Sequence, residues 1–455
     1  MLHLNMKKSI LFLLPILFSI PALCQVRFES PSFEQALQRA KESGRLIFLQ
    51  FESPTCDQCN EVANKAFEDT KLAAQMEQGF ICVKITADHP DRNKIANLYN
   101  KEKFLGSLFI SSDGALIHTF PKTTTLPAEY FKQIDIALTK AGEGLRISEF
   151  EKEYRNGNRN IAFLEQLLLL RKTLYLNIDS LLDEYVSLLP ADSLRSAVTL
   201  IFISRQYPVV GSNADMTLRR NQDLFNKAWY SLGLSDRVGI NNGIIYKSMQ
   251  KAIKEQNLDY AYRVASFARA TNTNNIKAGN KAYDSNILEY FKETNDTLNY
   301  LARAINFFDS YYMTVSVDSV KKRDSLNLKS LFGKQYAQRS QRGDSVVVKK
   351  TIHYSPVAQS FTRALNGGAW SFYKWTADAV YLQKALQWSY RAVEFYESPE
   401  VMDTYARLLY KTGKKNEAVE WESKAIVLKK KRGFTTSDFE KVLAGMKAGK
   451  STIDN

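Results

Sequence analysis

Cysteine is rare in this sequence, with four residues among 455, too few to staple the chain as a disulfide-rich miniprotein. Glycine and proline are also modest, at 20 and 11 residues, which excludes a collagen-like chain. Beyond the first 24 residues, no segment has the roughly 20 consecutive apolar residues that a membrane-spanning helix needs. What is present is a globular composition, 45% hydrophobic and 24% charged, in a length that allows two or three domains.

The first 24 residues have the features of a signal peptide. Two lysines precede an apolar run over residues 10–20, and Ala22 and Cys24 occupy the −3 and −1 positions before Gln25. Because the run is too short to cross a bilayer, we expect cleavage near Cys24–Gln25 and a secreted or periplasmic protein. The segment resembles leaders of Gram-negative exported proteins, which implies the periplasm. Lipidation of Cys24 is the alternative.

Three cysteines, Cys56, Cys59 and Cys82, remain after the predicted cleavage. In an oxidising compartment, two cysteines separated by two residues form either a structural disulfide or a redox centre. A disulfide that closes so small a loop removes little entropy from the unfolded chain and adds little stability. The spacing therefore favours a redox-active Cys56–Cys59 pair, with an inert disulfide or a metal site as alternatives. Cys82 lies in an apolar run and is expected to be a small core residue.

Residues 26–140 alternate between strand-like and helix-like patterns. Nearly continuous apolar runs, typical of buried strands, alternate with segments of helical spacing, and Asp113-Gly114 favours a hairpin turn between the last two strands. The predicted order is α-β-α-β-α-β-β-α, with room for one more short strand before the first helix. We expect strands over 46–51, 80–85, 107–111 and 115–120, and helices over 32–42, from the CxxC segment to about 78, from 91 to about 99, and over 127–140.

A CxxC pair between a central strand and the start of a helix resembles the thioredoxin fold. The similarity to secreted thioredoxin-like proteins is carried by 46–51, Cys56, Cys59, Phe67 and 80–84. It covers about a quarter of the chain and implies an α/β thioredoxin-like domain over 25–141. It also implies thiol–disulfide exchange with protein substrates that carry thiols or disulfides, and an electron donor or acceptor that renews the pair.

A dithiol oxidoreductase needs one thiolate that attacks and a second thiol that resolves the mixed disulfide. Cys56 is expected at a helix N-terminus, where unpaired N–H groups and the helix dipole lower the pKa of a thiol. We therefore expect Cys56 to attack and Cys59, one turn further, to resolve. Asp57 opposes thiolate formation and favours a more reducing pair. No cofactor or metal is expected, because two cysteines without a nearby histidine pair are too few ligands for zinc.

Several positions depart from the thioredoxin pattern. Gln50 stands where the family has a buried acid on the strand before the motif, and Glu52 is near enough to substitute for it. Thr55 replaces the usual aromatic residue before the first cysteine. Gly106 or Ser107 stands where the family has a cis-proline, in a loop that presents backbone to an extended substrate. These departures keep an alternative open, a non-catalytic interaction scaffold with a structural thioredoxin-like domain.

From about residue 142 onward, strand-like runs nearly vanish and apolar residues recur at helical spacing. The last part resembles a degenerate tetratricopeptide array, in which small residues stand where paired helices approach closely. These small residues are Ala406, Gly413, Ala418 and Ala425, and Ala385 precedes Ala418 by 33 positions. We expect a helical-repeat domain over 142–455, with a loop insertion near 317–356. Inter-helix core positions are expected for Trp370, Trp375, Trp388 and Trp421.

The formal net charge of +14 includes local clusters of Lys and Arg in the second half of the chain. We interpret these clusters as solvated helix ends and loops, and no nucleic-acid-binding motif is recognisable. The sequence thus predicts an exported thiol–disulfide oxidoreductase whose helical domain binds a protein partner, and it predicts no binding of nucleic acid.

Overall fold

The computed structural model describes residues 25–54, 56–99, 101, 104–142, 147–340 and 355–450, apart from the side chains of 57, 58 and 331–340. Its contacts divide the chain into two compact units between Leu189 and Pro190, and each unit is described by itself. The predicted leader over 1–24 and Thr55 lie outside the described residues. Within the described ranges, no helix is both long enough and apolar enough to span a membrane.

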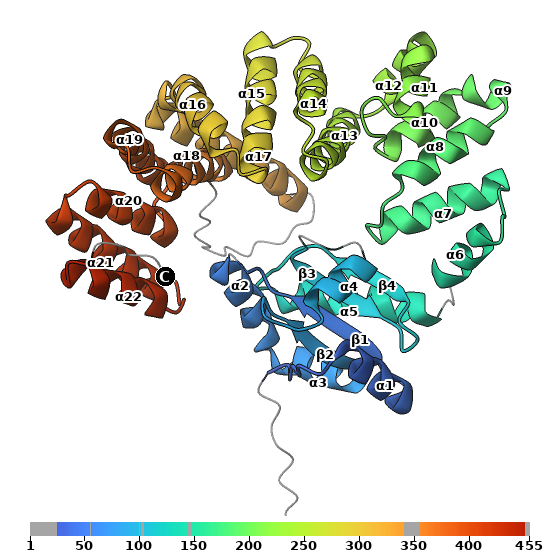
Figure 1. The fold of residues 1–455 in the computed structure, drawn as a ribbon, viewed down its shortest axis with the longest axis horizontal. Helices are drawn as coiled ribbons and strands as arrows, with labels where there is room; N and C mark the ends of the chain where they lie inside the picture. Colours follow the sequence, from blue (N-terminus) through green and yellow to red (C-terminus); the bar gives the residue numbers. More distant parts are fainter. Residues whose placement is uncertain are drawn as a thin grey trace, which may run out of the picture. The chain divides into compact units, whose positions relative to one another are not determined.

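The first unit contains a mixed four-stranded sheet in the order β2-β1-β3-β4 (Figure 1). β1 runs parallel to β2 and antiparallel to β3, and β3 pairs antiparallel with β4. The predicted strands and their hairpin are confirmed, but the extra short strand is reduced to a single bridge between Glu29 and Val83. The strands are β1 (Leu46–Phe51), β2 (Phe80–Ile85), β3 (Gly106–Ile110) and β4 (Leu116–Phe120).

Helices cover both faces of this sheet. They are α1 (Phe33–Ser43), α2 (Asp57–Phe67), α3 (Thr70–Gly79), α4 (Arg92–Leu98) and α5 (Pro127–Gly142). On one face, Phe48 of β1 packs in a buried cluster with Phe67 of α2 and Tyr130 of α5. The alternate side chains of β1 are also buried, because α1 and α4 lie against the other face, where Arg92 covers the ring of Phe51. The α/β thioredoxin-like arrangement of this domain is confirmed.

The single helix predicted from the CxxC segment to residue 78 is in fact two helices, α2 and α3. The carboxylate of Asp69 accepts the backbone N–H groups of Lys71 and Leu72, at 3.0 and 2.9 Å, and so caps the start of α3. An aspartate at this position satisfies N–H groups that a continuous helix would have paired with its own carbonyls. The apolar spacing continues through the break, so periodicity alone merged the two helices.

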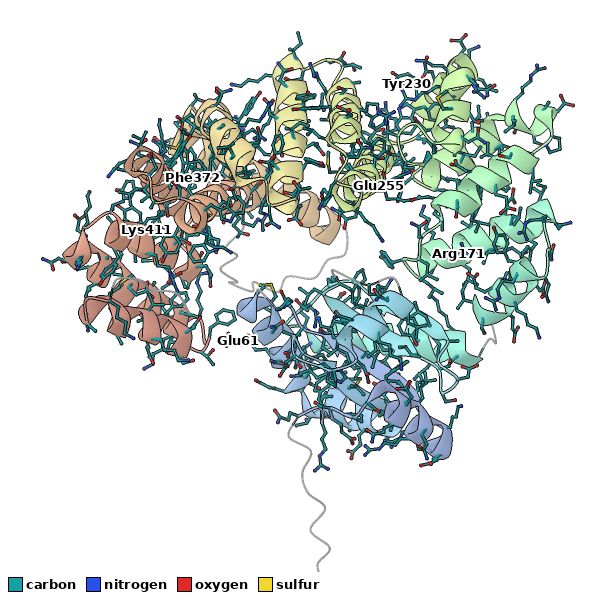
Figure 2. All side chains as sticks on the ribbon, viewed as in Figure 1. Glu61, Arg171, Tyr230, Glu255, Phe372 and Lys411 are labelled. Atoms are coloured by element: carbon teal, nitrogen blue, oxygen red, sulfur yellow. A yellow bond between two sulfur atoms is a disulfide. The ribbon has the colours of Figure 1, made fainter. Side chains whose placement is uncertain are left out.

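Three more helices belong to the first unit, namely α6 (Ile147–Arg155), α7 (Ile161–Thr173) and α8 (Asp179–Leu188). Arg171 of α7 (Figure 2) forms two hydrogen bonds with Glu151 of α6, at 2.7 and 2.8 Å. The first compact unit therefore extends beyond α5. The domain boundary expected at 141/142 stays a prediction.

The described part of the second unit is helical and contains no strand. Successive helices pack against each other, most extensively α18 with α19 and α20 with α21 (Figure 1). The elements are α9 (Ala191–Leu194), α10 (Ala197–Arg205), α11 (Asn213–Arg220), α12 (Gln222–Ser231), α13 (Leu234–Lys254), α14 (Leu258–Ala270), α15 (Ile276–Glu293), α16 (Thr297–Phe308), the π-helical η1 (Asp309–Met313), α17 (Val317–Ser340), α18 (Pro356–Trp375), α19 (Ala379–Phe395), α20 (Pro399–Lys411), α21 (Lys415–Lys431) and α22 (Ser437–Lys447). The long helical region after the α/β domain is confirmed.

The small residues of the repeat pattern fall into two groups. Those that are fully buried between helices, as predicted, are Ala385, Ala406, Ala418 and Ala425. Gly413 is different, because it lies in the turn between α20 and α21 with φ of +89°, and a Cβ atom at this position would have no neighbour within 4 Å. Gly413 provides the left-handed turn and not a close helix approach, so that expectation was wrong.

Trp370, Trp375, Trp388 and Trp421 pack in or against the core of the second unit, as predicted. Trp388 is fully buried against Phe308 and Phe372, and its indole N–H donates to Asp309 Oδ1 at 2.8 Å. The other three are partly buried against the same cluster. These rings therefore stabilise helix packing.

The loop predicted near 317–356 is helical in its first part, since α17 runs from Val317 to Ser340. Two contacts hold this helix in place. Val320 is fully buried, and the carboxylate of Asp324 accepts the N–H groups of Val357 and Ala358, at 2.8 and 2.9 Å, at the start of α18. The expectation of a loop was wrong here because composition alone did not reveal these anchors. Residues 341–354 lie outside the described ranges.

Candidate functional site

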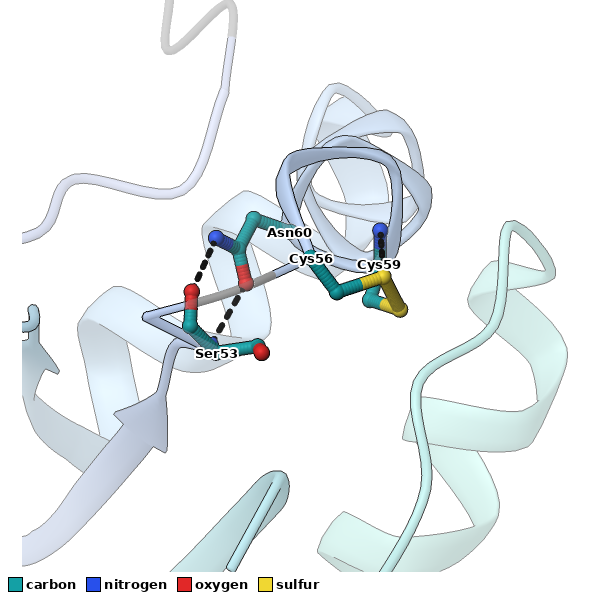
Figure 3. The surroundings of a disulfide bond; sticks show 4 residues. All are labelled: Ser53, Cys56, Cys59 and Asn60. Carbon is teal, nitrogen blue, oxygen red and sulfur yellow. Dashed lines mark hydrogen bonds between the residues drawn. A yellow bond between two sulfur atoms is a disulfide. The ribbon is translucent and has the colours of Figure 1, made fainter. Parts of the chain in front are cut away.

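The cysteine pair forms a disulfide at the first turn of α2 (Figure 3). The Cα atoms of Cys56 and Cys59 are 5.3 Å apart, and Cys56 is the N-cap residue of the helix. The backbone N–H of Cys59 donates to Cys56 Sγ, with 3.2 Å between nitrogen and sulfur. The first N–H groups of a helix have no carbonyl partner within it, so this sulfur takes the place of a capping oxygen.

The connection from β1 to α2 is fixed by Ser53 and Asn60. Asn60 Oδ1 accepts the backbone N–H of Ser53 at 2.7 Å, and Asn60 Nδ2 donates to the carbonyl of Ser53 at 2.9 Å (Figure 3). The Asn60 amide therefore gives hydrogen-bond partners to both the N–H and the carbonyl of Ser53. This contact positions Cys56 relative to the end of the central strand.

Gln50 is buried in the sheet with only 1% of its surface exposed. Its Oε1 accepts the hydroxyl of Ser107 at 2.7 Å, and its Nε2 donates to the carbonyl of Phe51 at 3.1 Å. The register places Gln50 opposite Ser107 on β3 and opposite Lys84 on β2. The structure thus brings Gln50 and Ser107 together as a neutral, hydrogen-bonded pair that offers no carboxylate to accept a proton.

Glu52 follows β1, and its side chain points toward the face of the sheet that α2 covers. Its Oε1 lies 3.3 Å from Lys84 Nζ, and the same ammonium donates to Asn64 Oδ1 of α2 at 3.0 Å. The Glu52 carboxylate is 19% exposed and Lys84 is 24% exposed. The direction of Glu52, which the sequence left open, is therefore toward Lys84 and the side of the sheet that α2 covers.

Gly106 has a backbone that no L-residue adopts without strain, with φ of +140°. A Cβ atom at this position would lie 2.2 Å from the carbonyl oxygen of Phe120 and 3.0 Å from the nitrogen of Lys122. Proline is excluded too, because its ring fixes φ near −65°. Gly106 pairs with Phe51 at the end of β1, so it lies at the same edge of the sheet as the segment that leads to Cys56.

Cys82 lies on β2 with 5% of its surface exposed. Burial raises the pKa of its thiol to about 12, so the sulfur stays protonated at neutral pH. It packs in the cluster that includes Phe48 and Phe80. This is the core position that the sequence predicted. Among the described residues, no group of three or more histidine, cysteine, aspartate or glutamate side chains is arranged to hold a metal ion.

Sequence reasoning missed two elements near the site. The clamp between Ser53 and Asn60 had a weak local signal, an asparagine directly after the CxxC motif. Lys101, which lies near Gly106 in the sequence, binds carbonyls of Leu174 and Tyr175, more than 70 positions away, and no local pattern indicates such a contact.

The comparisons with known proteins agree with this geometry over part of the chain. Residues 29–108 match the family model Thioredox_DsbH, which is described as a protein of unknown function, DUF255. No curated protein matches the chain. The match spans α1 to β3 and includes the disulfide and Gly106. The chain therefore contains a thioredoxin-like N-terminal domain with a CxxC disulfide, followed by a long helical region.

Proposed function

We propose that this chain is an exported thiol–disulfide oxidoreductase whose reactive group is the Cys56–Cys59 pair. The observation that carries the proposal is the disulfide at the start of α2, where Cys56 Sγ accepts the N–H of Cys59. After reduction, this N–H and the positive end of α2 stabilise negative charge on Cys56 Sγ, the form of sulfur that attacks a disulfide. The thioredoxin-like match over 29–108 supports the same chemistry.

In the reducing direction, the Cys56 thiolate attacks one sulfur of a substrate disulfide. A bond forms between the two sulfurs, the substrate S–S bond breaks, and the other substrate sulfur leaves as a thiolate that takes up a proton. Cys59 then loses its proton and attacks Cys56 Sγ, which restores the protein disulfide and releases the second substrate thiol. The substrate gains two electrons, so an external dithiol must reduce the pair again; the oxidising direction is the reverse.

The rest of the chain supports export and partner binding. The signal-peptide pattern over 1–24 supports export to an oxidising compartment, where a CxxC pair can cycle. The packed helices of the second unit offer an extended surface of the kind that helical arrays use to bind protein partners. We assign to this region the binding of a protein partner.

Two observations favour a second candidate, a scaffold without turnover. Gln50 is neutral and hydrogen-bonded to Ser107 and Phe51, and Gly106 or Ser107 stands where the thioredoxin pattern has the proline of its substrate-facing loop. A pair without a proton acceptor resolves its mixed disulfide slowly. Glu52 is the group that we test to decide between the candidates, because its carboxylate binds Lys84, which also donates to Asn64 of α2.

Trapping of a covalent intermediate tests the proposed function. In the chain from Gln25 onward, Cys59→Ser should form a stable mixed disulfide with a peptide that carries an internal disulfide, because Cys56 attacks and nothing resolves. The matched control is Cys56→Ser, which keeps one cysteine of the pair but lacks the attacking sulfur. An adduct with Cys59→Ser alone, reversed by dithiothreitol, supports exchange. Equal absence of adduct from both variants contradicts it and favours the scaffold.

A further inference from the structure

Lys101 is a buried lysine between α4 and β3, with 5% of its surface exposed. Its ammonium donates to the carbonyl of Leu174 at 3.1 Å and to the carbonyl of Tyr175 at 3.0 Å. Both carbonyls follow α7, which ends at Thr173. The side chain of Lys101 therefore joins sequence-distant parts of the first unit.

The C-terminal end of α7 explains why a lysine is tolerated in this buried place. The last carbonyls of a helix lack partners within it and form the negative end of the helix dipole, which attracts a cation. The hydroxyl of Thr119 on β4 donates to the same carbonyl of Leu174 at 3.2 Å. Burial lowers the pKa of Lys101 to about 8. The carbonyls at the end of α7 are the hydrogen-bond acceptors of its ammonium group, in the role that a carboxylate usually has for a buried lysine.

The backbone of Lys101 fixes the approach to β3. Its N–H donates to the carbonyl of Ala96 in α4 at 2.6 Å, and its carbonyl accepts the N–H of Phe104 at 3.1 Å. The ring of Phe104 packs edge-on against Phe51, with centroids 5.6 Å apart. It also lies next to Gly106, where an added Cβ atom would be 3.1 Å from Phe104 Cζ. Lys101 is thus connected by direct contacts to the strand end that leads to the dithiol.

The carbonyls that Lys101 binds follow α7, which is linked to its neighbours α6 and α8 by side-chain hydrogen bonds. Arg171 binds Glu151 through two hydrogen bonds, and Arg159 Nε donates to Glu184 Oε1 at 2.5 Å, so side chains link α6 with α7 and the segment before α7 with α8. The end of α7 that Lys101 binds is therefore connected by side chains to α6, and the segment before α7 to α8.

We propose that Lys101 is a positioning residue for thiol–disulfide exchange with polypeptide substrates. Its side chain binds the end of α7, and its backbone carbonyl binds Phe104, whose ring borders Gly106. Helices α6 to α8 thereby set the sheet edge that leads to Cys56, and an extended polypeptide docks against this edge. The proposal rests on the proposed function of the dithiol. We call Lys101, Thr119 and the carbonyls of Leu174 and Tyr175 the Lys101 latch. Small disulfides, which need no docking loop, do not depend on it.

The test uses the chain from Gln25 onward with Lys101→Met, which keeps the length of the side chain and removes its donors. Thr119→Val is a milder second variant that weakens the same latch, and Lys132→Met on the exposed side of α5 is the matched control. Two quantities are measured: amide hydrogen exchange in peptides that contain Phe104 or Tyr175, and the single-turnover rate of the reduced protein. The substrates are a peptide with an internal disulfide and a small aromatic disulfide.

For Lys101→Met, we expect faster amide exchange in both peptides and a roughly tenfold lower rate with the peptide disulfide, since small losses of alignment are costly. The rate with the small disulfide and the equilibrium with glutathione should change less than about twofold. Thr119→Val should shift the same quantities by less, and Lys132→Met should shift none. Unchanged amide exchange in Lys101→Met, or an equal fall in its single-turnover rate with both disulfides, would overturn this proposal. A wild-type chain that reacts with neither disulfide refutes the proposed function, and amide exchange then still decides whether the latch exists.

Discussion

Asn60 holds Ser53 through both atoms of its amide, at 2.7 and 2.9 Å, and thereby ties the first turn of α2 to the end of β1. The contact joins two backbone groups of Ser53 to the side chain of Asn60. Cys56, the N-cap residue of α2, therefore lies next to a first turn that is tied to the end of β1.

Replacement of Asn60 by alanine should therefore destabilise the first unit. Two lost hydrogen bonds, each contributing about 1 kcal/mol, predict a loss of about 2 kcal/mol in the free energy of unfolding. Urea denaturation measures it, and Asn93→Ala on the exposed side of α4 is the control that should change the free energy by less than about 0.5 kcal/mol. A loss for Asn60→Ala no larger than that of the control would contradict the clamp.

Gly106→Ala should destabilise the protein more than Gly44→Ala, although both glycines have a positive φ. At Gly106, a Cβ atom would lie 2.2 Å from a carbonyl oxygen, whereas a Cβ atom at Gly44, with φ of +68°, would have no neighbour within 4 Å. Backbone strain alone predicts a loss of about 1 kcal/mol for Gly44→Ala. We expect at least about 3 kcal/mol for Gly106→Ala, where a steric clash is added. Thermal denaturation of both variants measures the difference, and equal losses would refute the steric explanation.

Glu52→Gln tests whether this carboxylate assists the dithiol. We expect the rate at which the Cys56 mixed disulfide resolves to fall about tenfold, because a nearby base speeds proton removal from the resolving thiol. The matched control is Glu129→Gln, which breaks the exposed ion pair with Lys122. Rapid-quench kinetics with mass detection follow the intermediate. A resolution rate unaffected by Glu52→Gln would show that Glu52 is not the proton acceptor of the pair.

The helical unit should lose stability as pH rises, because of Glu422 in α21. This side chain is fully buried beside Asp403 of α20, and burial with that neighbouring carboxylate raises its pKa to about 9. Between its usual pKa and about 9, the folded state keeps a proton that the unfolded state has released. The free energy of unfolding should therefore fall by up to about 1.4 kcal/mol per pH unit across this range.

Glu422→Gln removes this titration, so the variant should be more stable than wild type at pH 8 and should approach it near pH 5. Glu420→Gln, an exposed position on the same helix, is the control and should keep the wild-type pH dependence. Urea denaturation at several pH values measures the slope. Parallel curves for wild type and Glu422→Gln would show that Glu422 does not titrate as described.

The predictable features of this protein were those with local signals. Cys56 and Cys59 lie within one helical turn, and their spacing between a strand and a helix indicated the disulfide and the fold around it. The lack of the thioredoxin-pattern proline at Gly106 or Ser107 was visible in the sequence, but the φ of +140° at Gly106 and the nearby carbonyl of Phe120 were not. Lys101 depends on a helix end more than 70 residues away, which no local pattern contains.

In the helical region, too, features with a local sequence signal were predictable and those that depend on distant contacts were not. Small residues such as Ala406 and Ala418 revealed the packed helix pair, because their spacing follows the helix. The start of α17 looked like a loop, because its polar composition hides the two contacts, through Val320 and Asp324, that fix it. Composition averages over a segment, whereas one buried valine and one capping carboxylate are enough to hold a helix.

The most direct test of the exchange reaction is a redox titration of the chain from Gln25 onward in glutathione and dithiothreitol buffers. After denaturation and alkylation, intact mass should show one label in the oxidised protein, on Cys82, and three in the reduced protein. We expect a single reversible two-electron transition at a potential between roughly −270 and −120 mV, the range of CxxC oxidoreductases. A pair that stays oxidised across this range, or thiols that never pair, would contradict the exchange reaction.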